Sequence, residues 1–356
     1  MKILQLIQKP QNRGAETFTC QLSKHLVKMG HEVRILAVFP GEAKLDWDQE
    51  IENIGGATGN RFLDYKAWKA LAKNIKDFQP DIVQANAGDT LKYAVFSKKV
   101  FRWSAPIIVR NASEVGQYLK SGVQKKLNHF LYKNVSRVLS VSQASKKDII
   151  HLFPFLRECT FVLPVGLESK IPKTIKLMPQ EVKHIAHIGG FSFEKNHKGL
   201  LEIFQLVIQD EPYLHLHLVG DGPLRWEIEN LVKEKGLQDS ITFHGFVNNP
   251  LDFCMAADVL VLPSIIEGLP GVLLEAMYCK TPVVAYDVGG IGEIVNNDTG
   301  YLIKKGDKNS FKKAILKVLA NKPKRKIENA LKMVKESYIN TQIALEFEAV
   351  YKDLLK

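Results

Sequence analysis

A chain of 356 residues with 46% apolar residues, 24% charged residues and a net charge of +11 has the composition of an ordinary globular protein. This composition excludes disordered, collagenous and coiled-coil chains, and no apolar run approaches the roughly 20 residues of a membrane span. The length is too great for one comfortable hydrophobic core, so it predicts two domains. The first stretch, MKILQLIQKP, is interrupted by Pro10 and is not typical of a signal peptide, so a cytoplasmic location is expected.

The N-terminal half alternates buried strands with amphipathic helices. Residues 2–7 predict a strand, residues 15–29 predict a helix that Gly30 ends, and residues 33–38 predict the next strand. This is a strand–helix–strand unit. The alternation continues with predicted helices over 65–77, 124–133 and 144–152 and predicted strands over 81–85, 107–110 and 137–141.

A break in the pattern separates the two halves. The stretch PVGLESKIPKTIKLMP, residues 164–179, has three prolines and no periodicity, which indicates a linker. The alternation then restarts, and residues 340–355 end the chain as a helix with an apolar stripe. The predicted strands lie over 184–188, 215–219, 241–243, 259–262 and 283–286, and the predicted helices over 198–209, 224–235 and 272–279.

Such alternation predicts an α/β fold in which parallel sheets are covered by helices on both faces. We expect two doubly wound, Rossmann-like domains that face each other across a cleft at the carboxyl ends of their strands. The N-terminal domain is predicted over 1–168, the linker over 169–182 and the C-terminal domain over 183–338. The helix within 339–356 is expected to pack back across the N-terminal domain.

The stretch EGLPGVLLE places two glutamates around a turn that leads into a helix. Glu267 follows a predicted strand, and the helix is expected to begin close to Val272. A helix N-terminus presents unpaired backbone N–H groups and binds phosphate well. Carboxylates beside it are better suited to accept hydrogen bonds from hydroxyl groups. We therefore expect Glu267 and Glu275 to accept hydrogen bonds from the hydroxyl groups of two sugars that flank one diphosphate.

The positive charge lies in the N-terminal half. Residues 1–170 hold 26 Lys and Arg against 15 Asp and Glu, whereas 171–356 hold 23 of each kind. A basic face indicates an anionic partner, either a membrane surface or a phosphorylated substrate, or else a solvated lysine-rich surface. The basic stretch has no nucleic-acid-binding motif, so no nucleic acid is expected. Four scattered cysteines without metal-binding spacing predict reduced thiols and no metal site.

Several stretches together resemble the retaining glycosyltransferases of group 1, also called family 4. PSIIEGLPGVLLEAMYCKTPVVA is similar to their signature of a glutamate, seven intervening residues and a second glutamate. The resemblance covers the chain except for about 40–135, and it implies the two-domain architecture called GT-B. The other matching stretches, in the family's order, are NRGAETFTCQLSKHLVKMGHEV, GGFSFEKNHKGLL, VGDGPLRWEIENL and VGGIGEIV.

The resemblance implies a role for each matching residue. Glu267 and Lys195 are the implied catalytic residues: Glu267 would bind hydroxyls of the transferred sugar and Lys195 the diphosphate, as Glu275 would bind the ribose. The resemblance also implies that no metal and no cofactor is needed beyond a UDP-, GDP- or ADP-sugar donor. The implied donor-binding set is Gly14, Gly190, Lys195, Phe246, Val247, Glu267, Gly268, Leu269, Gly271, Val272 and Glu275.

The chain departs from the family at the residues that resemble its phosphate segment and acceptor domain. An arginine common in the family is replaced by Gly190, which leaves Lys195 or Lys198 to supply the charge. Where the family often has histidines, this chain has Asn86 and Asn111, with Arg110 beside the latter. Asparagine can hydrogen-bond a sugar but cannot act as a base. The three residues are therefore predicted to bind the acceptor.

These expectations combine into a retaining glycosyltransferase that acts on a glycan or lipid-linked acceptor, in cell-surface polysaccharide or lipopolysaccharide biosynthesis. The segment 118–135 is amphipathic and rich in lysine, which fits contact with an anionic membrane at the inner face of the cytoplasmic membrane, or a helix packed on its own sheet. The alternatives are a nucleotide-sugar epimerase on the same fold and a non-catalytic protein that binds a sugar nucleotide.

Overall fold

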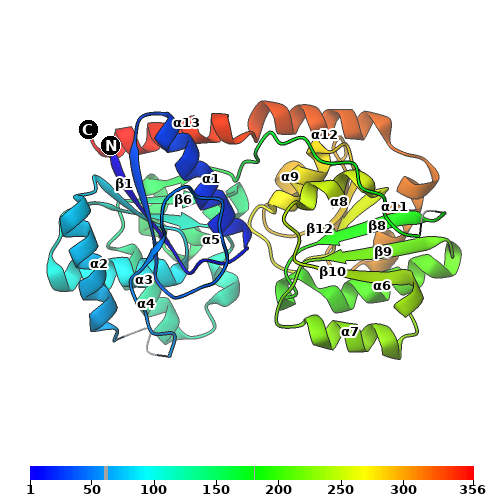
Figure 1. The fold of residues 1–356 in the computed structure, drawn as a ribbon, viewed down its shortest axis with the longest axis horizontal. Coiled ribbons are helices and arrows are strands. Elements are labelled where there is room, and N and C mark those ends of the chain that lie inside the picture. The colour runs from blue at the N-terminus through cyan, green and yellow to red at the C-terminus, as the bar shows by residue number, and fades with distance from the viewer. Residues whose placement is uncertain (60–62, 180) are drawn as a thin grey trace. The chain divides into compact units, whose positions relative to one another are not determined.

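The computed structural model describes residues 1–59, 63–179 and 181–356. Residues 60–62 of the predicted N-terminal domain and residue 180 of the predicted linker lie outside the described residues. The chain forms two compact units, which we call unit 1 and unit 2 (Figure 1). Unit 1 comprises Met1–Glu168 and Asn340–Lys356, and unit 2 comprises Ser169–Ile339.

Unit 1 is built on a seven-stranded sheet in the order β3-β2-β1-β4-β5-β6-β7, and its recorded strand pairs are parallel. The strands are β1 (Lys2–Ile7), β2 (Glu32–Ala37), β3 (Glu52–Asn53), β4 (Ile82–Ala85), β5 (Ile107–Asn111), β6 (Arg137–Ser140) and β7 (Thr160–Val162). The helices are α1 (Gly14–Lys28), α2 (Tyr65–Phe78), α3 (Gly88–Phe101), α4 (Gly122–Tyr132), α5 (Gln143–Leu152) and α13 (Asn340–Leu354), with 3-10 turns at Val115–Tyr118 and Pro154–Cys159.

Helices cover both faces of this sheet, because successive side chains of a strand point to opposite faces and the strands are apolar runs, so both faces are apolar. Ile3 and Ile82 pack with Phe18 of α1 and Phe347 of α13. The side chains next to these in sequence, such as Leu4, point the other way and pack against α2 and α3 on the opposite face of the sheet. The strand order reverses next to β1, which makes the sheet doubly wound.

Unit 2 repeats the plan with six parallel strands in the order β10-β9-β8-β11-β12-β13. The strands are β8 (Lys183–Ile188), β9 (Leu214–Val219), β10 (Ile241–Gly245), β11 (Val259–Leu262), β12 (Val283–Asp287) and β13 (Tyr301–Lys304). The helices are α6 (His197–Asp210), α7 (Arg225–Glu234), α8 (Pro250–Ala256), α9 (Gly271–Tyr278), α10 (Ile291–Ile294), α11 (Lys308–Ala320) and α12 (Lys324–Ser337), with 3-10 turns at Phe193–Lys195 and Gln238–Ser240. The two sheets confirm the predicted α/β class.

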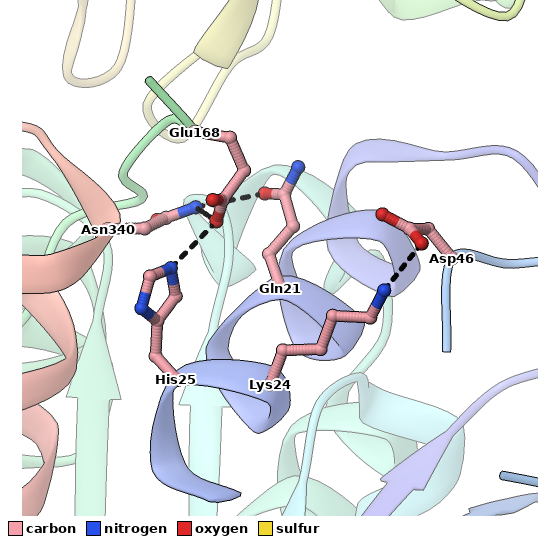
Figure 2. Close-up of polar contacts among 6 residues, drawn as sticks. All are labelled: Gln21, Lys24, His25, Asp46, Glu168 and Asn340. Carbon is pink, nitrogen blue, oxygen red and sulfur yellow. Dashed lines mark hydrogen bonds and ion pairs between the residues drawn. The ribbon is translucent and has the colours of Figure 1, made fainter. Parts of the chain in front are cut away.

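Polar contacts join the end of the first segment of unit 1 to the start of α13 (Figure 2). The Asn340 amide donates to Glu168 Oε1 at 2.6 Å, and His25 Nε2 of α1 lies 3.0 Å from the same oxygen. The backbone N–H of Asn340 donates to the Leu167 carbonyl at 3.0 Å. A Cβ on Gly166 would lie 2.4 Å from Asn340 Oδ1, so a larger residue there would displace the Asn340 side chain. The point where the chain leaves unit 1 is thus bonded to the point where it returns.

Candidate active site

The strand order of unit 2 reverses between β8 and β11. At such a switch point the loops after the two strands run in opposite directions, and this is where doubly wound sheets bind ligands. The loop after β8 leads through Gly189 and Gly190 to Lys195, and the loop after β11 leads to Glu267. The topology therefore brings these two predicted residues to one edge of the sheet.

Lys195 and Glu267 form an ion pair at this edge. Lys195 Nζ lies 2.6 Å from Glu267 Oε1, and the two side chains are 21% and 11% exposed. Both groups are largely withdrawn from water yet remain reachable. Such a pair can exchange its internal contact for contacts with a ligand that has both an anionic and a hydroxyl group.

Two hydrogen bonds hold these two loops together. The N–H of Ile265 donates to the Glu194 carbonyl at 2.8 Å, and the Asn196 amide donates to the Pro263 carbonyl at 3.0 Å. Asn196 has a φ of 55° and its side chain caps the N-terminus of α6 at Gly199. Asparagine tolerates this left-handed conformation, which turns the chain sharply between Lys195 and α6.

Close glycine contacts fix the neighbouring loops. Gly220 has a φ of +134°, and a Cβ on it would lie 2.1 Å from the Gly189 carbonyl oxygen. A Cβ on Gly289 would lie 1.9 Å from the Glu267 carbonyl oxygen. The N–H of Gly290 also donates to the Gly268 carbonyl at 2.7 Å. The main chain around Glu267 is thus held by backbone, where a side chain would not fit.

The helix α9 begins at Gly271, immediately after this loop. The first N–H groups of a helix have no partner within it, so those of Gly271 and Val272 are suited to an anion. A Cβ on Gly271 would meet nothing within 4 Å, so the space before the helix is open within unit 2. Gly268 and Leu269 are buried in the turn that precedes it.

Glu275 lies in the second turn of α9 and has an unusual protonation equilibrium. Burial raises the pKa of its carboxyl from 4.5 to about 7. Removal of the carboxyl from water disfavours its charged form. Hydrogen bonds from ligand hydroxyl groups would favour the charged form, so a ribose bound there would lower this pKa again.

The structure distinguishes the two lysines that the sequence left open. Lys198 Nζ pairs with Glu227 of α7 at 2.5 Å, and the two side chains are 58% and 46% exposed. Lys198 therefore points to the solvated side of α6, whereas Lys195 points to Glu267. Phe246, 51% exposed, and Val247 follow β10 directly. Gly190 has room for a Cβ at 3.4 Å from the Asp221 carbonyl oxygen.

The predicted acceptor residues lie inside unit 1. Asn86 is 3% exposed, and its amide donates to Gln5 Oε1 at 2.9 Å and to the Leu6 carbonyl at 3.2 Å. Asn111 is 4% exposed and donates to Ser140 Oγ at 3.3 Å. Their amide groups are occupied by these contacts, so their role toward an acceptor stays a prediction.

Arg110, the third predicted acceptor residue, is also buried. Its side chain is 3% exposed and its guanidinium lies 4.3 Å from the Phe18 ring centroid. Burial lowers its pKa to about 10, against the attraction of Glu16. Gly14, predicted to bind the donor, is the first residue of α1, and a Cβ on it would meet nothing within 4 Å among the described residues. Among the described residues of unit 1, nothing therefore requires glycine at that position.

Sequence reasoning missed the residues that build the site. Asn196, Gly220 and Gly289 are not predicted to contact the donor. Their contacts instead bring the loops of the site together. The motif VGDG and the Gly-Gly pair in VGGIG are the signals that point to close backbone approach. His197 was also missed: it stacks on Phe191 with ring centroids 4.0 Å apart, and burial lowers its pKa, so it is neutral beside Lys195.

The whole fold is similar to that of solved glycosyltransferases. The structure of Anabaena Alr3699/HepE in complex with UDP-glucose superposes with a TM-score of 0.83 at 20% identity, covering 99% of this chain and 100% of that one. The fold is therefore that of the GT-B class of glycosyltransferases.

Sequence comparison assigns the family within that class. The model for "Glycosyl transferases group 1" matches residues 171–333, and the model for "Glycosyltransferase Family 4" matches residues 12–170. The chain is 38% identical over 325 residues to 2-deoxystreptamine glucosyltransferase of Streptomyces kanamyceticus, which covers 80% of this chain and 83% of that protein. This chain belongs to the group 1, family 4 glycosyltransferases.

Other relatives match over part of their length. The chain is 26% identical over 236 residues to N-acetylgalactosamine-N,N'-diacetylbacillosaminyl-diphospho-undecaprenol 4-alpha-N-acetylgalactosaminyltransferase of Campylobacter jejuni, covering 64% of each. In three such relatives the matched region spans between 55% and 64% of the relative.

Proposed function

We propose that this glycosyltransferase transfers a sugar from a UDP-, GDP- or ADP-sugar to a hydroxyl group of a glycan or lipid-linked acceptor, with retention of the anomeric configuration. The observation that carries the proposal is the Lys195–Glu267 pair at the switch point of unit 2, beside the N-terminus of α9. An ammonium, a carboxylate and a helix N-terminus match the phosphate and the hydroxyls of a nucleotide sugar. The family membership and the relatives that bear glycosyltransferase names support the same reaction.

In this reaction the bond between the anomeric carbon and the diphosphate oxygen breaks, and a bond from that carbon to the acceptor oxygen forms. Lys195 and the first N–H groups of α9 stabilise the negative charge that develops on the leaving diphosphate. Glu267 holds the hydroxyls of the transferred sugar, and Glu275 holds the ribose. The departing phosphate takes the proton of the acceptor hydroxyl, as the family resemblance implies. No metal or cofactor is proposed.

We further propose that the enzyme binds its acceptor at an anionic membrane surface, the inner face of the cytoplasmic membrane. The reaction would then belong to cell-surface polysaccharide or lipopolysaccharide assembly. Helix α4 of unit 1 exposes Val123 by 78% and Phe130 by 39%, and Lys125 and Lys126 beside them are exposed. Apolar side chains flanked by lysines suit an anionic interface. Among the residues that the structure describes, no helix is long and apolar enough to span a bilayer.

The donor site is tested by offering UDP-, GDP- and ADP-sugars with a membrane lipid extract and measuring the nucleotide released. We expect Glu267→Ala to lower release from the preferred donor by about 100-fold, since one transition-state contact is worth a few kcal/mol. Glu227→Ala is the matched control, because Glu227 also pairs with a lysine but on the exposed side of α6. Equal release by the two variants would remove Glu267 from the site.

The membrane contact is tested separately. Replacing Lys120, Lys125 and Lys126 with Glu is expected to weaken binding to anionic vesicles at least tenfold, because each basic residue near such a surface contributes about 1 kcal/mol. Sedimentation with vesicles measures it, and vesicles of zwitterionic lipid are the control. Unchanged binding to anionic vesicles means that α4 is not the contact.

A further inference from the structure

A groove on unit 2 lies between the end of α9 and the helix α12. Its volume is about 540 Å³, and five lysines and two glutamates are among its lining residues. The predicted donor residues do not line it. Helix α12 packs on α9 within unit 2 (Figure 1), so the groove lies within one compact unit.

The floor and the rim of the groove differ in chemistry. Ile327 and Leu331, one turn apart on α12, are partly buried in the floor, while Ala330 and Val334 face the core. Lysines rim this apolar pair, since Lys324 precedes it and Lys335 follows it on the same helix. This is the pattern of a helix that lies at a membrane interface, where long lysine stems cover apolar surface and their ammonium groups reach phosphate.

One rim residue is held in an unfavourable backbone conformation. Lys280 has a φ of +61° and ends α9 in a Schellman motif, in which its N–H donates to Met277 and the N–H of Thr281 donates to Ala276. Glycine is the usual residue at this position because it has no Cβ. The chain instead places a lysine there, and its side chain lines the groove. Strain retained at a surface lysine points to a use for its charge.

The rim lysines are available to an anion. Among the residues that the structure describes, Lys332 pairs with Glu336 at 4.0 Å, and Lys280, Lys322 and Lys324 have no ion pair. The groove thus combines a net positive rim with an apolar floor.

We propose that this groove docks anionic lipid headgroups and so places unit 2 on an anionic membrane surface. The lipid phosphates contact Lys280, Lys324 and Lys335, and Ile327 and Leu331 meet the upper part of the acyl chains. Single-stranded nucleic acid is bound largely by stacking of its bases on aromatic side chains, and the lining residues of the groove include none. An acidic peptide would leave the apolar floor without a partner. The contact is distinct from the one proposed for α4.

The test measures binding of the full chain to vesicles of equal parts phosphatidylglycerol and phosphatidylcholine. The variants are Lys280→Gly and the double variant Lys324→Gln/Lys335→Gln. The control is Lys233→Gln/Lys313→Gln, which removes the same charge from exposed positions on α7 and α11 of unit 2. All are repeated with Lys120, Lys125 and Lys126 changed to Glu, so that a loss is assigned to the groove and not to α4.

We expect about fivefold weaker binding for each groove lysine removed, and a smaller loss for the control pair. Lys280→Gly is the decisive variant, because glycine relieves the left-handed strain: its melting temperature should rise while its vesicle binding falls. Binding of both groove variants equal to that of the control pair overturns the proposal. Inorganic phosphate tests for a small-anion site: if it stabilises the wild-type chain but not Lys324→Gln/Lys335→Gln, while vesicle binding is the same in both, the proposal is overturned.

Discussion

The two sheets reverse their strand order at equivalent places, but the loops there carry different chemistry. In unit 2 the switch point between β8 and β11 holds the charged, reachable pair Lys195 and Glu267. In unit 1 the switch point between β1 and β4 is followed by Asn86, whose amide is buried and bonded to Gln5. Gln8 and Asp89 close the same edge with a hydrogen bond of 2.8 Å.

The difference shows that the doubly wound fold provides the location of a site but not its chemistry. The Asn86 amide in unit 1 is already bonded within the protein, and the nearby Asp89 carboxylate pairs with Lys92 at 2.9 Å. A charged pair with partial exposure retains the capacity to rearrange around a ligand. We therefore propose that the groups that bind the donor lie in unit 2, and changes on either side of the comparison test this.

The largest effect is expected at Lys195. Lys195→Met should lower kcat by about 100- to 1,000-fold, because it removes the charge that faces the leaving diphosphate. Lys198→Met is the matched control, and less than a tenfold change is expected because Lys198 pairs with the exposed Glu227. Steady-state rates with a saturating donor measure both. A larger loss of kcat in Lys198→Met than in Lys195→Met would show that Lys198, and not Lys195, contacts the diphosphate.

A stability effect of intermediate size is expected at Glu275. The folded chain holds the proton more tightly than the unfolded chain, since the pKa is raised from 4.5 to about 7. The resulting cost is absent below the lower value, grows between the two and is complete above pH 7. Glu275→Gln should therefore raise the free energy of unfolding by about 3 kcal/mol at pH 8, and by little at pH 4.

Urea unfolding at the two pH values measures this effect, with the exposed Glu227→Gln as control. The same variant should bind the donor more weakly, because an amide accepts fewer hydrogen bonds from ribose hydroxyls than a carboxylate. A stability gain that does not depend on pH would contradict the assignment of the effect to the carboxyl charge.

The smallest effect is expected at the switch point of unit 1. Asn86→Ala should lower the free energy of unfolding by about 2 kcal/mol, because two buried acceptors lose their donor. Gly14→Ala is the control, and a change below about 0.5 kcal/mol is expected because its Cβ meets open space. If Asn86→Ala leaves stability intact but raises the KM for the acceptor, Asn86 contacts the acceptor after all.

Local sequence patterns explain why much of the fold was predictable. The strands of both sheets are short apolar runs such as residues 2–7, where the predicted strand and β1 have the same bounds. Helix α3 was not predicted, because its apolar residues do not form one clear stripe that sets it apart from its neighbours. Helices α11 and α12 do have such stripes, and a search for helical period over 308–337 would have found them.

The candidate site was predictable in part, because family signatures lie in local stretches such as EGLPGVLLE. The burial of Arg110 was not, since it depends on α13, which returns to unit 1 from the far end of the chain and packs with α1 over β5. The sequence pattern of residues 107–111 does not reveal a packing partner that lies roughly 240 positions away.

By itself the sequence determined the alternation of strands and helices, the family and the pair of glutamates, because these depend on neighbouring residues. The tertiary structure alone decided that Lys195, and not Lys198, faces Glu267. Lys195 and Glu267 are 72 positions apart, and their meeting depends on the left-handed turn at Asn196 and on loops packed through Gly220 and Gly289. Such contacts arise from the packing of separate segments, and no local periodicity specifies them.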